Sequence, residues 1–225
     1  MKHCMVDLET LGTKPGSALL SLGAVMFDES GVGARFYAVL GTGPQFTHGA
    51  TVSDSTAAWW ERQSAEAREV LTAAGAAQDT EAQLRRFFAW WREQGAKYIW
   101  GRGANFDPPL LGATLELFGL EAPWKFYDVR CERTLTALFP QIKAPPFSGT
   151  RHCADADAAH QALHASMILR HIRDMQSPLN RALDRGEEQL VNPSAADPLG
   201  MGLTTDAAID TDLGAAIARI RKEKQ

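Results

Sequence analysis

The spacing of apolar residues changes near residue 53, from the short runs typical of strands to a helical period. Three apolar runs precede that point, at residues 3–6, 18–27 and 34–40. A polar turn at residues 28–31 separates the last two runs. This order predicts an initial strand followed by an antiparallel hairpin.

Helical spacing dominates the middle of the chain. Helices are predicted from residue 53, over 65–74 and from Thr80, where Thr-x-x-Gln resembles a capping box. The third of these helices carries apolar residues at helical intervals, namely Leu84, Phe87, Phe88 and Trp91. Strands are then predicted at 98–100 and around 126–127, and helices from near residue 108 and from about residue 131. Strands come first, and helices and strands alternate afterwards, which predicts an α/β fold.

A long helical segment at residues 155–174 follows the proline-rich loop at 144–146 and is predicted to be the last helix of the core. Beyond residue 177 the chain becomes polar and contains several prolines and glycines. We therefore expect a folded domain over residues 1–176 and a tail over 177–225, with a short helix at 206–221.

Composition narrows the class of protein without deciding its function. A chain of 225 residues fits one full-sized domain, and the formal net charge of −4 offers no basic surface for general nucleic-acid binding. No signal peptide or membrane-spanning run is visible, and three scattered cysteines suggest neither disulfides nor a zinc site. We expect a cytoplasmic protein that does not associate with membranes.

Asp7 and Glu9 stand two residues apart after the first apolar run. In a strand, side chains two positions apart point to the same face, so both carboxylates can bind one cation. A pair of acids at a strand end is also common at solvated termini, so the pair needs support from the rest of the chain.

Asp107 precedes two prolines and stands where a helix is expected to begin. Capping of that helix would explain it. An aspartate that caps a helix still has a second oxygen for a cation, so the two interpretations are compatible.

His152 lies in the loop before the long helix, and Asp157 lies in the first turn of that helix. An imidazole from the loop and a carboxylate fixed on the helix can converge on one point. Asp155 is an alternative ligand, but its spacing from His152 is less favourable. His160 and His164 stand four residues apart, and without an H-E-x-x-H motif they are expected to be semi-buried or surface histidines.

Three motifs, in this order, resemble those of the DEDDh exonucleases. They are Asp7-Leu8-Glu9-Thr10, Asn105-Phe106-Asp107, and His152 separated from Asp157 by four residues. The segment at residues 53–68 is similar to a branch of this superfamily that is frequent in phages. The resemblance implies an RNase H-like fold with a mixed five-stranded sheet flanked by helices. It also implies removal of nucleotides from the 3′ end of single-stranded DNA or RNA, and in some relatives a homodimer, for which the chain shows no heptad pattern.

The same resemblance implies roles for the residues of the motifs. Asp7, Glu9, Asp107 and Asp157 would bind two divalent cations, Mg²⁺ or Mn²⁺, because oxygen ligands suit these ions. His152 would act as the general base, since an imidazole accepts protons near neutral pH. The terminal nucleotide would contact three further residues, Leu8, Thr10 and Leu11.

Two alternatives remain open at this point. The same chemistry would cleave short oligonucleotides or dinucleotides, and an RNase H-like domain can bind nucleic acid without cleaving it. Trp59 and Trp60 could stack on bases, although adjacent aromatic residues on a helix usually place one in the core.

Overall fold

A computed structural model describes residues 1–184 of the chain. Residues Met1–Gln176 form one compact unit. The helix predicted at 206–221 lies outside the described residues, so the boundary between domain and tail stays a prediction. Within residues 1–184, none of the helices combines the length and the apolar character needed to cross a bilayer.

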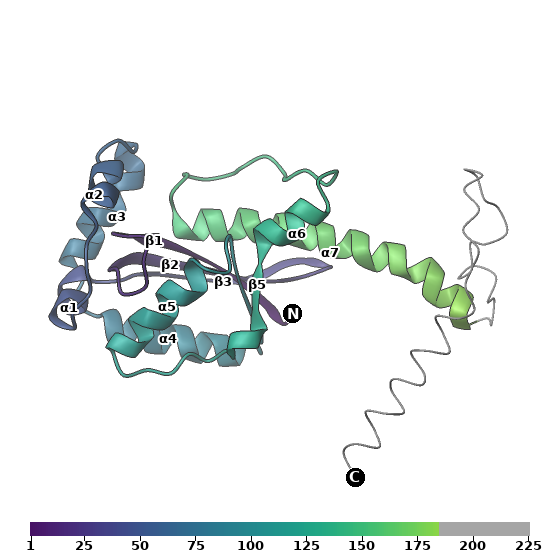
Figure 1. The fold of residues 1–225 in the computed structure, drawn as a ribbon, viewed down its shortest axis with the longest axis horizontal. Helices are drawn as coiled ribbons and strands as arrows, with labels where there is room; N and C mark the ends of the chain where they lie inside the picture. The colour runs from purple at the N-terminus through teal and green to yellow at the C-terminus, as the bar shows by residue number, and fades with distance from the viewer. Residues whose placement is uncertain (185–225) are drawn as a thin grey trace, which may run out of the picture. The chain divides into compact units, whose positions relative to one another are not determined.

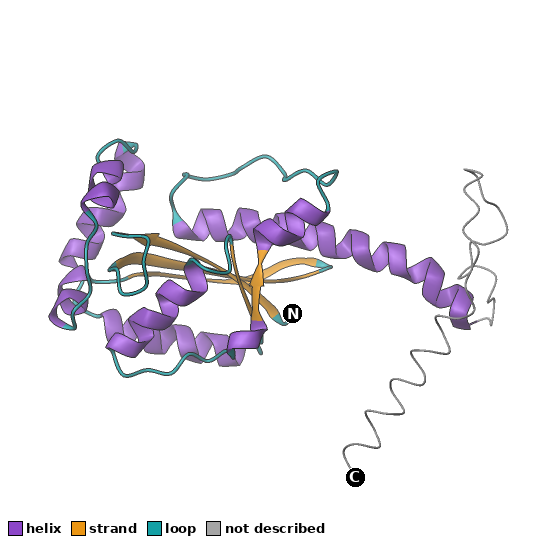
Figure 2. Cartoon of the chain, viewed as in Figure 1, coloured by secondary structure: helices purple, strands orange, loops and turns teal. Residues whose placement is uncertain are grey.

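The centre of the unit is a five-stranded mixed sheet (Figures 1 and 2). Its strands are β1 (His3–Thr10), β2 (Leu19–Asp28), β3 (Gly31–Val39), β4 (Tyr98–Gly101) and β5 (Val129–Cys131), in the order β3-β2-β1-β4-β5. The first three strands are antiparallel, and β4 and β5 run parallel to β1. The carboxyl ends of β1 and β4 therefore lie on the same side of the sheet.

Helices surround the sheet, and all of them except α1 follow the order that the apolar periods predict. They are α1 (Thr42–Thr47), α2 (Asp54–Trp60), α3 (Ala65–Ala76), α4 (Thr80–Glu93), α5 (Asp107–Leu117), α6 (Glu132–Leu138) and α7 (Ala154–Asp184), with a 3₁₀ turn η1 (Phe126–Asp128). Figure 1 shows α4 and α5 on one face of the sheet and α7 on the other. The expected α/β architecture is confirmed.

The alternation of side chains along β1 separates the two faces. Cys4, Val6 and Leu8 point to the face covered by α4 and α5, where Phe87 and Leu111 complete the core. Burial of that face supplies most of the apolar area removed from water, and each fully buried large side chain contributes about 2 kcal/mol. The opposite face of β1 looks toward α7.

The α7 face has a thinner core, because this helix contributes small residues. Ala158, Ala162 and Ala165 pack against Met5 and Trp100. Small side chains allow the helix axis to approach the sheet closely, so polar groups on the same helix face can reach β1.

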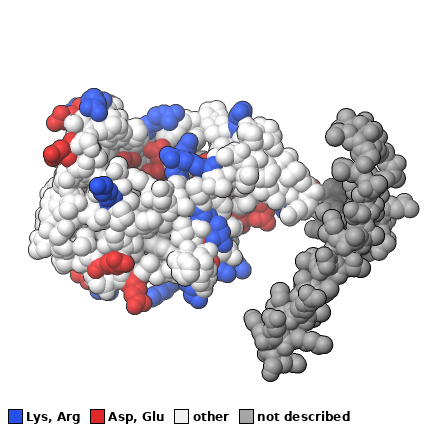
Figure 3. Space-filling view, viewed as in Figure 1, with Lys and Arg blue, Asp and Glu red and all other residues white. Residues whose placement is uncertain are grey.

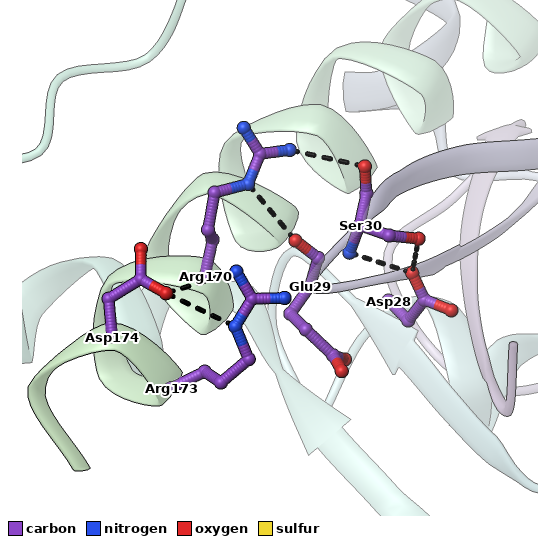
Figure 4. A network of polar contacts seen from close by, with 6 residues as sticks. All are labelled: Asp28, Glu29, Ser30, Arg170, Arg173 and Asp174. Carbon is purple, nitrogen blue, oxygen red and sulfur yellow. Dashed lines mark hydrogen bonds and ion pairs between the residues drawn. The ribbon is translucent and has the colours of Figure 1, made fainter. Parts of the chain in front are cut away.

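Gly23 of β2 allows the first turn of α7 to touch the sheet. It pairs with Asp7 of β1, and a Cβ atom at this position would overlap the backbone of Ala154 and Asp155. A later turn of α7 is held at the β2–β3 turn. There the Arg170 guanidinium donates to the carbonyl oxygens of Glu29 and Ser30 (Figure 4). Together these contacts fix α7 across the sheet.

Several predicted boundaries were wrong. The strand expected around residues 126–127 is the 3₁₀ turn η1, closed by the Asp128 amide on the Lys125 carbonyl, and the strand follows at Val129. Thr80 does not cap α4, because its hydroxyl donates to the Gly41 carbonyl while Asp79 occupies the cap position. Helix α1 was not predicted, since it has only six residues and little apolar pattern.

Two elements are longer than predicted. Strand β1 continues through Thr10, so Asp7 and Glu9 lie within it and not after it. Helix α7 continues to Asp184, beyond the predicted end at residue 174.

Candidate active site

Asp7 and Glu9 of β1 share the strand face that looks toward α7, as their two-residue spacing predicts. Asp157, in the first turn of α7, reaches the same point. One carboxylate oxygen from each of the three residues lies within 4.8 Å of the other two. The structure thus brings Asp157 next to Asp7, which precedes it by 150 residues in the chain, and next to Glu9.

Asp155 takes a different direction. Its Oδ2 lies 3.6 Å from Arg35 Nη1 of β3, and its side chain is about one third exposed. Because Asp155 and Asp157 are two residues apart on a helix, their side chains diverge by about half a turn. The geometry therefore places Asp157, and not Asp155, against β1.

Asp107 lies beside the cluster and outside its closest set. It is the first residue of α5 and is 3% exposed, and its Oδ1 accepts a hydrogen bond of 3.3 Å from the Leu8 amide of β1. A Cβ atom on Gly101, the last residue of β4, would lie 2.8 Å from Asp107 Oδ2. Glycine at that position lets the carboxylate sit directly over the end of the sheet.

Gln161 is a site residue that sequence reasoning missed. Its Nε2 donates to Asp7 Oδ1 at 2.6 Å. It stands four residues after Asp157, so both side chains lie on one face of α7. That i, i+4 spacing was the available signal.

Burial and mutual repulsion change the acidity of this cluster. Burial, followed by the nearby charges of Asp107, Glu9 and Asp157, raises the pKa of Asp7 well above its usual value, while the bond from Gln161 partly opposes this. Burial and the charges of Asp157 and Asp107 raise the pKa of Glu9 to about 8. Burial raises the pKa of Asp107 to about 7, against the hydrogen bond from Leu8.

These carboxylates suit a hard divalent cation. Within the described residues no Lys or Arg forms an ion pair with Asp7, Glu9 or Asp157, and the buried Oδ2 of Asp157 has no hydrogen-bond partner there. Buried acids without cationic partners cost free energy, and a cation bound by their oxygens removes that cost. The acidic cluster could therefore bind a divalent metal.

The cluster opens into a cavity of about 580 Å³. The cavity is lined by Asp7, Leu8, Glu9, Thr10, Thr13, Ser55, Thr56, Trp59, Trp60, Arg102, Phe106, Arg151, His152, Asp157 and Gln161. It combines carboxylates, hydroxyls, two arginines and aromatic faces, as a pocket for a polar ligand with a flat ring requires.

His152 reaches this cavity from a strained loop. Its φ of 60° lies in the left-handed region, which residues other than glycine rarely adopt. Its ring lies 4.9 Å from the Trp59 ring at a nearly perpendicular angle. Trp60 is 2% exposed and its Nε1 donates to the Thr10 carbonyl at 2.9 Å. Both tryptophans line the cavity, but Trp60 is buried in the core whereas Trp59 is partly exposed.

Of the three residues expected to contact the terminal nucleotide, Leu8 and Thr10 line the cavity. Leu8 also packs in the core, and the Thr10 hydroxyl donates to the Gly12 carbonyl at 2.7 Å. Leu11 instead packs against Leu20 and Trp60, because the chain bends after the end of β1.

Two histidines of α7, His160 and His164, contact backbone carbonyl groups of the preceding loop, and His160 is partly buried while His164 is buried. His160 Nε2 lies 2.9 Å from the Pro145 carbonyl oxygen, and His164 Nε2 lies 2.8 Å from that of Ile142. Both histidines tie α7 to the loop that precedes it.

The chain also matches a known protein family. A family model described as the Rv2179c-like 3′-5′ exoribonuclease domain matches residues 2–169. The chain belongs to this family. The match covers every strand of the sheet and the four acids, and the protein is therefore a nuclease that hydrolyses its substrate from the 3′ end.

Two solved structures are similar in fold. One is the nuclease domain of 3′hExo, a DEDDh family member bound to rAMP, with 14% identity and a TM-score of 0.50 over 75% of this chain and 92% of that chain. The other is cell-death related nuclease 4 (CRN-4), with 11% identity and a TM-score of 0.50 over 77% of this chain and 64% of that chain. The expected RNase H-like fold of the DEDDh exonucleases is confirmed. A comparison with curated protein sequences gave no match.

Proposed function

We propose that this Rv2179c-like domain is a two-metal-ion exonuclease that removes nucleoside 5′-monophosphates from the 3′ end of single-stranded nucleic acid. The observation that carries the proposal is the close group of Asp7, Glu9 and Asp157, which lines the cavity. Such a group, with Asp107 beside it, provides oxygen ligands for more than one cation.

Asp7, Glu9 and Asp157 would hold one cation, and Asp7 with Asp107 would hold the second. Bound divalent cations neutralise phosphate charge and make water a stronger nucleophile near neutral pH. Mg²⁺ and Mn²⁺ both suit a set of carboxylate ligands. Gln161 keeps one oxygen of Asp7 in a fixed direction through its 2.6 Å hydrogen bond.

His152 would accept the proton of the attacking water. The water oxygen forms a bond to the phosphorus of the terminal nucleotide, and the bond to the 3′ oxygen of the preceding nucleotide breaks. That oxygen then takes up a proton, which leaves a new 3′ hydroxyl. The His152 ring lies against Trp59, which fixes its position in the cavity wall.

Trp59 would stack on the terminal base, because it is the partly exposed tryptophan of the cavity. Stacking of a base on an aromatic side chain contributes about 1 to 3 kcal/mol in single-strand binders. Leu8 and Thr10 would contact the sugar of the same nucleotide.

RNA is the substrate that we propose first. The family is described as an exoribonuclease domain, and one structural neighbour was solved with rAMP. The hydroxyl groups of Thr13, Ser55 and Thr56 line the cavity and can meet a 2′ hydroxyl, the group that separates RNA from DNA.

The direct test follows 3′-labelled and 5′-labelled single-stranded RNA and DNA with Mn²⁺, Mg²⁺ or EDTA. We expect metal-dependent release of mononucleotides from the 3′ end, faster on RNA, and no release by Asp7→Ala. A length series from dinucleotides upward separates a polymer exonuclease from an enzyme of short oligonucleotides. Absence of cleavage with every metal and every length would disprove the proposal.

A further inference from the structure

Glu132 is a buried acid outside the cluster. It is the first residue of α6 and only 1% exposed. Its Oε2 atom is buried and has no hydrogen-bond partner within the described residues. A buried carboxylate oxygen without a partner is costly and rare, so this atom calls for a functional explanation.

The other oxygen of Glu132 is held by the last core helix. Glu132 Oε1 lies 3.3 Å from His164 Nδ1 of α7, and the opposite ring nitrogen of His164 lies 2.8 Å from the Ile142 carbonyl. The imidazole is thus fixed at both ends. It holds the Glu132 carboxylate in one orientation, with Oε2 directed away from α7.

Arg102 is the cation that Oε2 faces. Its Nε lies 3.9 Å from Glu132 Oε2, which is beyond hydrogen-bond distance but within ion-pair range. The side chain is about half exposed and lines the cavity. Because Nε faces Glu132, the two terminal Nη groups stay available to an anion in the cavity.

We propose that Arg102 binds a backbone phosphate of the nucleic acid near the scissile bond, and that Glu132, held by His164, positions its guanidinium. The inference rests on the proposed function, since it takes the substrate strand as the ligand. A guanidinium presents donors on two edges, so one edge can meet the carboxylate while the other meets the phosphate. A shortening of the 3.9 Å distance between Arg102 Nε and Glu132 Oε2 when the strand binds would also give Oε2 a hydrogen-bond donor.

The second arginine of the cavity is held differently. The Arg151 guanidinium lies over the Phe147 ring, 4.6 Å from its centroid, and forms no ion pair within residues 1–184. On the face drawn in Figure 3, Lys and Arg side chains lie beside a hollow in which acidic side chains are visible. Of the two arginines that line the cavity, Arg102 is the one with a buried acid beside it, and this distinguishes it from Arg151.

The test compares Arg102→Met, Arg102→Lys and Glu132→Gln with the wild-type chain on a single-stranded oligonucleotide. Arg85→Met is the matched control, because Arg85 also pairs with a glutamate, Glu81, and lies outside the cavity. We expect Arg102→Met to raise KM about tenfold or more. The slope of log KM against log salt should fall by about 0.7, the value for one phosphate contact on a single strand.

A positioning role for Glu132 predicts a specific pattern. Glu132→Gln should raise KM less than Arg102→Met does and leave kcat close to the wild-type value, whereas a purely structural defect would lower both the melting temperature and kcat. In the Arg102→Met background, Glu132→Gln should have no further effect on KM. Arg102→Lys should restore the salt slope but not the full affinity, because lysine lacks the second edge.

Binding of the same oligonucleotide with Ca²⁺ in place of Mg²⁺ separates this proposal from the proposed function. If the wild-type chain binds the strand in Ca²⁺ but cleaves it with neither Mg²⁺ nor Mn²⁺, and Arg102→Met weakens binding while Arg85→Met does not, the phosphate contact stands and the hydrolysis assignment fails. If Arg102→Met leaves KM, binding and salt slope at the level of Arg85→Met, the phosphate contact is disproved. A chain that neither binds nor cleaves any strand disproves both.

Discussion

At the scale of single residues, the site separates neighbours that look equivalent in sequence. Asp155 and Asp157 are both acids in the first turn of α7, yet one pairs with Arg35 and the other meets Asp7 and Glu9. Trp59 and Trp60 are adjacent, yet only Trp60 is fully in the core. The helical angle between successive residues produces both differences.

The aspartate pair gives the first prediction. Asp157→Asn should lower kcat by at least about a hundredfold, because the cations that we propose for these acids would contribute several kcal/mol of charge stabilisation. Asp155→Asn is the matched control and should keep nearly full activity, since it loses one exposed ion pair. Steady-state cleavage of a labelled oligonucleotide measures both. Equal losses in the two variants would contradict the assignment of Asp157.

His152 gives the second prediction. His152→Ala should lower kcat roughly 10²- to 10⁴-fold while changing metal affinity little, because a general base acts on the water and not on the cations. The variant should also relieve the left-handed backbone strain only slightly, since alanine is strained at φ 60° as well. Isothermal titration with Mn²⁺ measures the metal affinity, and single-turnover kinetics measure the rate of cleavage. A large loss of metal binding would contradict the role as base.

At the scale of elements, the site depends on how closely α7 approaches β1. The alanines of α7 and Gly23 of β2 permit this approach, and Gln161 links the helix to Asp7. The helix therefore acts as a rigid carrier that brings one carboxylate and one amide to the end of a strand. Its register along the sheet decides whether the acids share a cation.

Gly23→Ala tests this contact. The added methyl group would overlap the backbone of Ala154 and Asp155, so the first turn of α7 must move away from β1. We expect a loss of about 1 to 3 kcal/mol in the free energy of unfolding, together with a marked loss of activity as Asp157 moves. Gly112→Ala is the control, since nothing lies within 4 Å of the added atom on α5. It should stabilise the helix by up to about 1 kcal/mol.

Denaturant unfolding measures the free energy of unfolding of both glycine variants, and cleavage assays measure their activity. If Gly23→Ala keeps full activity and stability, the close packing of α7 on the sheet is not what holds Asp157 in place.

At the scale of the whole molecule, the acidic cluster links stability to pH and to metal. The folded chain keeps protons on Asp7, Glu9 and Asp107 at pH values where the unfolded chain has released them, because burial raises all three pKa values. The unfolded state then binds fewer protons than the folded state, so the free energy of unfolding decreases as pH rises. For Glu9 the window runs from its ordinary 4.5 to about 8.

We therefore expect the metal-free protein to melt at a lower temperature at about pH 8 than at about pH 6. Saturating Mn²⁺ should raise the melting temperature more at the higher pH, where the acids are ionised and bind the cation without losing protons. Glu9→Gln removes one of the groups and should flatten the pH dependence. Thermal denaturation in EDTA and in Mn²⁺ measures the effect, and a melting temperature that rises with pH in EDTA would contradict it.

The sequence by itself determined the order of elements, the family and the set of acids, because local periodicity and motif spacing are properties of the chain. The two-residue spacing of Asp7 and Glu9 and the helical position of Asp157 were sufficient to place these residues on suitable faces. It could not reveal the contacts of Arg102 and Glu132, or the bond from Gln161 to Asp7, since these join segments far apart in the chain; for Gln161 only its spacing from Asp157 was visible in the sequence. Only the tertiary structure decided those contacts, the burial that raises the acid pKa values, and which of the two cavity tryptophans stays partly exposed, because each depends on how elements that are distant in the chain pack together.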